Sequence, residues 1–151
     1  MEKARIAFAC LVLALAAACS GQNVQTATYA TYAEAQAAGA VDKGWVPSIL
    51  PERAYELRAA YAVNGSHRWG LFNFPAEAQD SLRSILETEE IPMAGTVLDV
   101  PGRIEWWPVI LRGHVDAERA RTTGLRAYRA KSAPLVFAVN WNQGRAYYWT
   151  R

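Results

Sequence analysis

The chain has 151 residues, 52% of them hydrophobic, and its 16 Lys and Arg side chains are nearly balanced by 14 Asp and Glu. This length suits one domain with a single core, and a formal net charge of +2 gives no electrostatic case for binding nucleic acid. Only two cysteines are present, Cys10 and Cys19, and both lie in the first 19 residues. A disulfide framework is therefore not expected to hold the domain together.

The first residues have the anatomy of an export signal. Lys3 and Arg5 precede an apolar run, Ile6 to Cys19, that ends in small residues. A bilayer-spanning helix needs about 20 apolar residues, and this run is shorter. We therefore expect residues 1–18 to be a signal peptide that is removed, which leaves 133 of the 151 residues.

The triplet Ala16-Ala17-Ala18 before Cys19 resembles the lipobox of bacterial lipoproteins, although Ala16 stands where a leucine is usual. The resemblance implies that Cys19 carries acyl chains on its sulfur and its new amino terminus, and several chains on one residue give stable membrane attachment. Ser20 follows, and in Gram-negative lipoproteins the absence of aspartate there favours the outer membrane. We expect palmitate-type lipidation at Cys19 and a place on the periplasmic face of the outer membrane. The alternative is an ordinary cleaved signal followed by a chance cysteine.

The residues after the cysteine are polar and lack periodicity, so residues 19–28 are predicted to be the lipidated cysteine and a tether. The globular domain is then expected to cover residues 29–151. It begins with a short extended piece, Tyr29–Thr31, and a helix over Ala33–Ala38 that ends at Gly39.

A hairpin is predicted next. Pro47 and Pro51 exclude regular structure in GWVPSILP, whose apolar residues are expected to lie against the core. Residues 52–63 have a helix-forming composition but also alternate as a strand does. Since Asn64-Gly65 is a turn signal between extended runs, strands are favoured over residues 56–63 and 68–74.

A helix is predicted over residues 75–90. Pro75 suits its first turn, and Ala78, Leu82, Ile85 and Leu86 make one apolar stripe. Glu87, Glu89 and Glu90 are then interpreted as the solvated end of this helix. Residues 93–112 contain several prolines and glycines and are expected to be mostly loop.

The C-terminal third reads most clearly. A small helix is expected over Asp116–Thr122, ending at Gly124, with a strand over Leu125–Ala130. Two alternating apolar runs, residues 135–141 and 145–149, surround a glycine turn and predict a C-terminal β-hairpin. The fold class is therefore α+β, a single domain with an antiparallel sheet and a C-terminal hairpin packed against one or two helices.

Four segments together resemble a family of uncharacterised small bacterial proteins, many of them lipoproteins, some of the YbbD head-like domain type. The segments are TYATYAEAQAAGAV, GWVPSILPERAYEL, WGLFNF and the closing GRAYYW. The resemblance spans most of residues 29–151 and implies a single domain. Family members generally have no assigned activity, so it implies no mechanism.

No catalytic grouping is apparent. The two histidines, His67 and His114, lie in unrelated contexts, and no nucleophile elbow accompanies them. His114 and Asp116 offer two metal ligands with no obvious third, so neither a metal nor a cofactor is expected. An enzyme, such as a cell-envelope hydrolase, would need a pocket that gathers Glu105, His114 and Asp116.

Tryptophan is the one feature that points to binding. The chain has six, and tryptophan is enriched at contact surfaces and sugar platforms. Trp106 and Trp107 are consecutive, so on an extended segment they point opposite ways and one is expected to be exposed. With Arg103 and Arg112 they form the candidate binding site for a peptide or glycan strand. The alternative is that these rings pack the core.

The sequence thus predicts a non-catalytic binding or envelope-accessory module attached to the membrane through Cys19. Its expected partner is a protein or a cell-wall glycan. An envelope hydrolase and an inhibitor or immunity-type protein are the alternatives.

Overall fold

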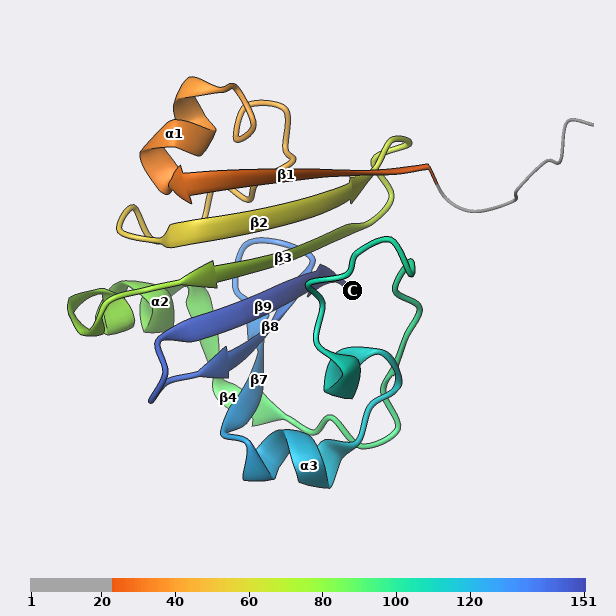
Figure 1. Cartoon of the computed structure of the whole chain (residues 1–151). Helices are drawn as coiled ribbons and strands as arrows, with labels where there is room; N and C mark the ends of the chain where they lie inside the picture. The colour runs from red at the N-terminus through yellow and green to blue at the C-terminus, as the bar shows by residue number, and fades with distance from the viewer. Residues whose placement is uncertain (1–22) are drawn as a thin grey trace, which may run out of the picture.

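The computed structural model describes residues 23–151. The expected signal peptide and Cys19 lie outside the described residues. One antiparallel sheet of seven strands dominates the structure, in the order β1-β2-β3-β9-β8-β7-β4, and a two-stranded sheet pairs β5 with β6 (Figure 1). Within the described part, no helix is both long and apolar enough to span a bilayer.

The strands are β1 Val24–Thr31, β2 Tyr55–Ala62, β3 Arg68–Asn73, β4 Leu86–Ile91, β5 Val97–Leu98, β6 Gly113–His114, β7 Leu125–Ala130, β8 Leu135–Asn140 and β9 Arg145–Thr150. The α-helices are α1 Tyr32–Ala37, α2 Gln79–Ile85 and α3 Ala117–Thr122, and two 3-10 turns are η1 Ala76–Ala78 and η2 Val109–Leu111. The antiparallel sheet and the C-terminal hairpin agree with the sequence analysis.

The predicted tether is wrong for residues 24–28. β1 begins at Val24 and pairs with β2 from Val24 opposite Ala62 to Thr31 opposite Tyr55. The error has a physical reason. β1 is an edge strand whose small polar side chains, among them Thr26 and Thr28, remain exposed, so its sequence has no apolar alternation to mark it.

The segment between β1 and β2 folds back over the sheet. Helix α1 ends where expected, before Gly39, whose φ of 76° is a conformation that glycine adopts most easily. In the GWVPSILP segment, Val46 and Leu50 are buried as expected. Trp45 stacks on Tyr61 of β2 with ring centroids 4.5 Å apart. This segment therefore seals one face of the sheet.

The hairpin of β2 and β3 confirms the strand reading of residues 56–63 and 68–74. The helix-forming composition of residues 52–63 is overridden because Leu57 and Ala59 are buried against the core. The pairing shifts register between Tyr55 and Arg58, and Glu56 at this bulge has a φ of 49°.

The predicted helix over residues 75–90 is wrong in its second half. It ends at Ile85, and Leu86 is already extended, with φ −102° and ψ 148°. Residues 86–91 are β4, the strand that pairs with β7. A helix and a strand both bury Leu86 and expose the acidic residues 87–90, so the pattern cannot separate them. Pairing with β7 decides for the strand, and it also avoids negative charge at a helix C-terminus.

The C-terminal elements lie where the sequence predicts them. Asp116 caps α3 by accepting a hydrogen bond from the Arg119 backbone N–H at 2.9 Å. β8 and β9 form the hairpin, which turns at Gly144. A Cβ there would lie 2.4 Å from the Phe74 carbonyl oxygen, so the turn requires glycine.

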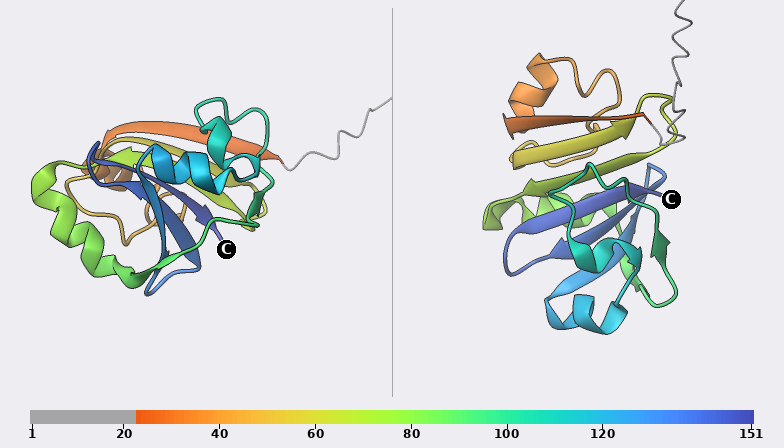
Figure 2. Two further views of the ribbon diagram at one scale, coloured as in Figure 1. Left: turned by 90° about the horizontal axis from the view of Figure 1, so that it is seen from below. Right: turned by 45° about the vertical axis from the view of Figure 1, so that its right-hand side comes forward.

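The sheet has two differently covered faces (Figure 2). We call the first the α2 face, since α1, residues 39–54 and α2 supply buried side chains to its core cluster, including Tyr32, Val46 and Leu82. The second, the α3 face, lies under residues 92–112 and α3. Its cluster includes Ile104, Trp107 and Ala120.

Tyr148 is the central ring of the α2 face. It packs against Phe72 and Phe137 with centroid separations of 6.4 and 5.7 Å, and burial raises its pKa above the ordinary tyrosine value. Its ring crosses Gly70 on the neighbouring strand, where a Cβ would come within 1.9 Å of the Tyr148 Cζ. The glycine inside β3 is therefore required by packing.

Candidate functional site

Trp106 and Trp107 point in different directions, as two consecutive residues on an extended segment would. Trp107 is only 2% exposed, and its Nε1 donates a hydrogen bond to the Leu111 carbonyl oxygen at 2.8 Å. Its ring meets those of Tyr147 and Trp149 edge to face. Trp107 is thus a core residue, and its place in the predicted binding site is wrong. Trp106 remains half-buried.

The two predicted arginines hold the chain to itself. Arg112 Nη1 donates to the carbonyl oxygens of Val100 and Pro101 at 2.8 and 3.1 Å, and its Nη2 donates to that of Ile104 at 2.7 Å. Arg103 Nη1 donates to the Val24 carbonyl oxygen at 3.2 Å. Arg112 therefore shapes the loop that covers the α3 face, and the four predicted residues do not form one surface.

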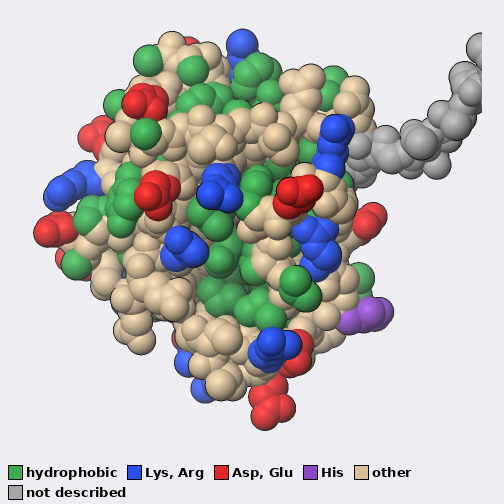
Figure 3. Space-filling model, viewed as in Figure 1, with side chains coloured by type: hydrophobic (Ala, Val, Ile, Leu, Met, Phe, Trp, Pro, Cys, Tyr) green, Lys and Arg blue, Asp and Glu red, His purple; other side chains and the backbone are tan. Residues whose placement is uncertain are grey.

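Trp106 instead forms a wall of a groove that opens on the α3 face, which we call the sheet-face groove. Its volume is about 470 Å³. Strands β1, β2, β3 and β9 and the covering loop line it with Thr28, Tyr29, Ala30, Glu56, Arg58, Leu71, Trp106, Arg145 and Tyr147. In Figure 3 this face of the molecule shows hydrophobic side chains near its middle, with basic and acidic side chains around them.

The floor of the sheet-face groove is one row of the sheet. Thr28 lies opposite Arg58, Arg58 opposite Leu71, and Leu71 opposite Tyr147. Directly opposite residues of antiparallel strands point to the same face with their Cβ atoms about 5 Å apart. Four strands from distant parts of the chain therefore place these side chains side by side.

A chain of hydrogen bonds closes one end of the groove. The Asn73 amide nitrogen donates to the Glu56 carboxylate, and Arg145 Nε donates to Asn73 Oδ1 at 2.9 Å. Asn73 is only 8% exposed, and it is one of two buried polar side chains among the described residues. Glu56 reaches it from the bulge, in the left-handed conformation described above. Such backbone strain persists only where surrounding contacts enforce it, and it is often found at binding sites.

Arg58 is the free cation of the groove. Its side chain is exposed and makes no hydrogen bond or ion pair with any residue in 23–151. A guanidinium binds carboxylate or phosphate groups through two parallel hydrogen bonds. The rings of Trp106 and Tyr147 offer flat apolar surfaces beside it. The groove is thus suited to a ligand that has both an anionic group and a ring or apolar face.

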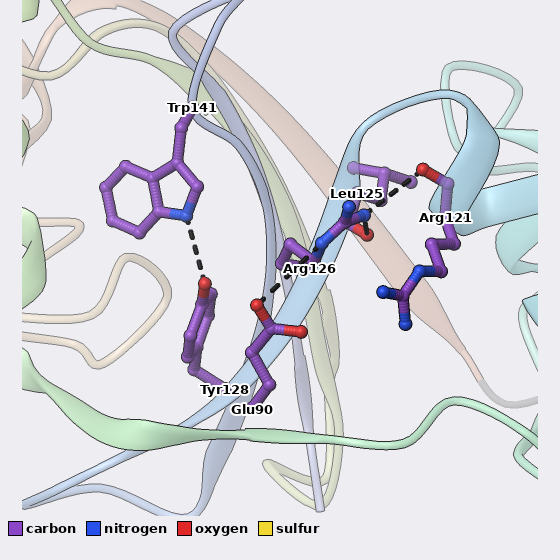
Figure 4. Close-up of polar contacts among 6 residues, drawn as sticks. All are labelled: Glu90, Arg121, Leu125, Arg126, Tyr128 and Trp141. Carbon is purple, nitrogen blue, oxygen red and sulfur yellow. Dashed lines mark hydrogen bonds and ion pairs between the residues drawn. The ribbon is translucent and has the colours of Figure 1, made fainter.

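A second hollow, of about 520 Å³, lies between β4 and α3, and Arg126 in its lining is already held by the protein itself. Figure 4 shows Arg126 held on two sides: Nε lies 3.7 Å from the Glu90 carboxylate, and Nη1 donates to the carbonyl oxygens of Arg121 and Leu125. The Trp141 Nε1 donates to the hydroxyl of Tyr128, two residues along the same strand. We take the smaller sheet-face groove as the candidate site, because its lining combines the exposed Arg58 with the rings of Trp106 and Tyr147.

The residues considered for catalysis line neither hollow. Glu105, His114 and Asp116 are each exposed, and Asp116 is occupied as the cap of α3. His67 stacks on Trp69 with centroids 5.8 Å apart and its Nδ1 bonds the neighbouring Ser66 hydroxyl at 2.9 Å. Among residues 23–151, no group of three or more His, Cys, Asp or Glu side chains is arranged to hold a metal.

Sequence reasoning missed Arg58, Arg145, Glu56 and Asn73. The first three are charged residues in strands whose side chains alternate between the two faces, and a charged side chain at such a position usually faces solvent. Asn73 carried a usable signal, because it is the one strongly polar side chain in the otherwise apolar run from Leu71 to Phe74.

Residues 23–73, about a third of the chain, match the family model of the YbbD head domain. This segment runs from β1 to the end of β3 and includes Glu56, Arg58 and Asn73. It confirms the resemblance predicted from the sequence for that part, while the C-terminal part of the resemblance lies outside the match. No curated protein and no solved structure matches the chain.

Proposed function

We propose that this chain is a non-catalytic binding module of the bacterial cell envelope that holds a carboxylate-bearing glycan of the cell wall in the sheet-face groove. The observation that carries the proposal is the free guanidinium of Arg58 beside two aromatic rings. Kinship with the YbbD head domain over residues 23–73 supports it, since the small bacterial proteins that the sequence resembles include many lipoproteins.

The size and chemistry of the groove favour a glycan. A volume of about 470 Å³ lies within the usual range of ligand sites, roughly 300–1,000 Å³, and suits one or two sugar rings. Sugar faces stack on tryptophan and tyrosine, which Trp106 and Tyr147 offer. Acidic sugars and the peptides linked to them supply the carboxylate for Arg58.

Binding without catalysis fits the lining of the groove. Its lining has one carboxylate, Glu56, and that carboxylate accepts a hydrogen bond from Asn73. Glycoside hydrolysis normally requires two carboxyl groups about 5 to 10 Å apart on either side of the bond. Among residues 23–151, no histidine, cysteine or serine lines the groove to act as base or nucleophile.

Calorimetric titration with soluble cell-wall muropeptides tests the ligand. We expect binding to the wild-type chain and at least a tenfold loss of affinity for Arg58→Met, since a hydrogen-bonded charge contributes about 1.5–3 kcal/mol. Arg53→Met is the matched control, because Arg53 is an exposed arginine of the same segment that does not line the groove. No heat of binding to the wild type, or an equal loss in both variants, would overturn the proposal.

The membrane anchor is a separate part of the proposal. Mass spectrometry of the protein from its native membrane fraction should find an N-terminus at Cys19 that carries acyl chains. Cys19→Ser should leave the chain unprocessed or unattached. An unlipidated terminus at another residue, or normal membrane fractionation of Cys19→Ser, would contradict lipidation while leaving the groove untouched.

A further inference from the structure

The two edges of the large sheet are built differently. β4 carries Glu87, Glu89 and Glu90 and shifts register against β7 between Leu86 and Glu90. Charged side chains and bulges are the means by which proteins prevent a sheet edge from pairing with another strand. β1, at the opposite edge, has eight residues, VQTATYAT, none charged, and its pairing with β2 is regular (Figure 1). β1 thus lacks the protection that β4 has.

The outward backbone groups of β1 can be identified from their partners. The Ala30 N–H donates to the Glu34 carboxylate at 2.9 Å, and the Val24 carbonyl accepts from Arg103, so both residues direct their backbone away from β2. Backbone direction alternates along an antiparallel strand, so Thr26 and Thr28 direct theirs outward too. Among residues 23–151, no side chain or loop pairs with these two. The edge is thus capped at both ends and open in the middle.

We infer that this edge pairs with β1 of a second copy of the chain, antiparallel, about a two-fold axis at Ala27. In this register Val24 lies opposite Ala30 of the second copy, and Thr26 opposite Thr28. Cross-strand threonine pairs are favourable, and the small side chain of Ala27 allows close approach on the axis. The sheet would then continue through both copies, as symmetric dimers often arrange.

The charges at the ends of the edge select this partner and this register. Arg103 caps one end of β1 and Glu34 the other, so an antiparallel copy brings each Arg103 beside the Glu34 of its partner. The Ala30 N–H of one copy would then bond the Val24 carbonyl of the other. This replaces the two caps and frees the arginine and the glutamate to form an ion pair. The surface is therefore complementary to itself in both hydrogen bonding and charge.

This pairing is independent of what the groove binds, but it has a consequence there. Thr28 and Ala30 belong both to the outer edge of β1 and to the lining of the sheet-face groove. Two grooves would therefore lie next to each other across the axis. A repetitive polymer could engage both, and the second contact would be strengthened by the first.

Sedimentation equilibrium of the full chain in detergent tests the pairing. We expect the wild type to be a dimer and Thr26→Pro to weaken association at least tenfold, since proline removes an outward N–H but is tolerated on an edge strand. Thr26→Ala keeps the N–H and is expected to stay dimeric. A monomeric wild type, or association of Thr26→Pro equal to that of Thr26→Ala, would overturn the inference.

Charge reversal tests the same register without proline, and so remains decisive if Thr26→Pro fails to fold. Arg103→Glu and Glu34→Arg should each weaken association several-fold, and the double variant should restore most of the loss. Failure of the double variant to recover would contradict the register. In addition, Ala27→Cys should oxidise to a dimer whose two introduced thiols are joined, whereas Ala33→Cys on α1 should not. A cross-link of equal yield in both would count against the axis at Ala27.

Discussion

The two faces of the sheet differ in how they are closed. The α2 face lies under helices and a buried loop, and rings such as Phe72, Phe137 and Tyr148 fill it. The α3 face lies under an irregular loop that Arg112 holds through three carbonyl hydrogen bonds. Within that loop, Trp106 forms a wall of the sheet-face groove. The comparison teaches that a face closed by apolar packing leaves a small hollow, of about 120 Å³, whereas a face closed by hydrogen bonds leaves room for a groove of about 470 Å³.

The largest effect should come from opening the α2 face. Leu82→Ala removes a side chain with 0% exposure from the centre of this cluster and should lower the free energy of unfolding by about 2–5 kcal/mol. Urea denaturation followed by circular dichroism measures it. Ser81→Ala, an exposed neighbour, is the control and should change stability by less than about 0.5 kcal/mol. A small effect at Leu82 would show that the face is not tightly packed.

Overpacking the α2 face should lower the free energy of unfolding by a somewhat smaller amount. Gly70→Ala forces a Cβ against the Tyr148 ring and should destabilise the fold by about 1–3 kcal/mol, because the buried ring has little room to move. The same substitution in a Tyr148→Leu background should cost less, since the clash is gone. Equal costs in the two backgrounds, measured by thermal or urea unfolding, would argue against the ring contact.

Loosening the cover of the α3 face should have a local effect. Arg112→Lys keeps the charge but cannot serve three carbonyls in the same geometry. Amide hydrogen exchange in residues 98–107 should become roughly tenfold faster, an opening about 1.4 kcal/mol easier, while β8 and β9 keep their protection. Uniform acceleration across the sheet would mean instead that Arg112 supports the whole fold.

The smallest effect should be at the paired charges beside α3. Glu90→Gln removes the charge that lies 3.7 Å from Arg126, in a pair whose side chains are 30% and 50% exposed, and keeps the carbonyl hydrogen bonds of Arg126. An ion pair this accessible to water contributes about 0.2–1 kcal/mol, and less at high salt. Urea denaturation at low and high salt measures it. A loss of more than about 2 kcal/mol in the free energy of unfolding would mean that this ion pair is shielded from water.

The regular elements were predictable where period and turn chemistry agreed. β7 to β9 and α3 follow from alternating apolar runs, a glycine turn and the glycine that follows the short helix. The sequence failed at β1 and β4 because both are edge strands. Their exposed residues do not alternate with buried apolar ones. In addition, β4 follows α2 without a break, and Leu86 is buried whether it belongs to a helix or to a strand.

The candidate site was predictable only in part. The sequence named Trp106 and Trp107 together and predicted that one of the two rings is exposed, but which of them is buried depends on where Leu111 and Tyr147 lie. Arg58 and Arg145 could not be recognised, because their proximity arises from the order of strands β2, β3 and β9. Nothing local distinguishes them from solvated surface arginines.

The sequence by itself determined the antiparallel sheet, the hairpins, the glycines that end two helices and the resemblance to the YbbD head domain over residues 23–73. These depend on interactions between residues near one another in the chain, so they leave a local pattern. Only the tertiary structure decided which tryptophan is core, where the sheet ends and which side chains share the groove. Those depend on strands that are far apart in sequence, and such contacts leave no period or motif that can be read from the chain alone.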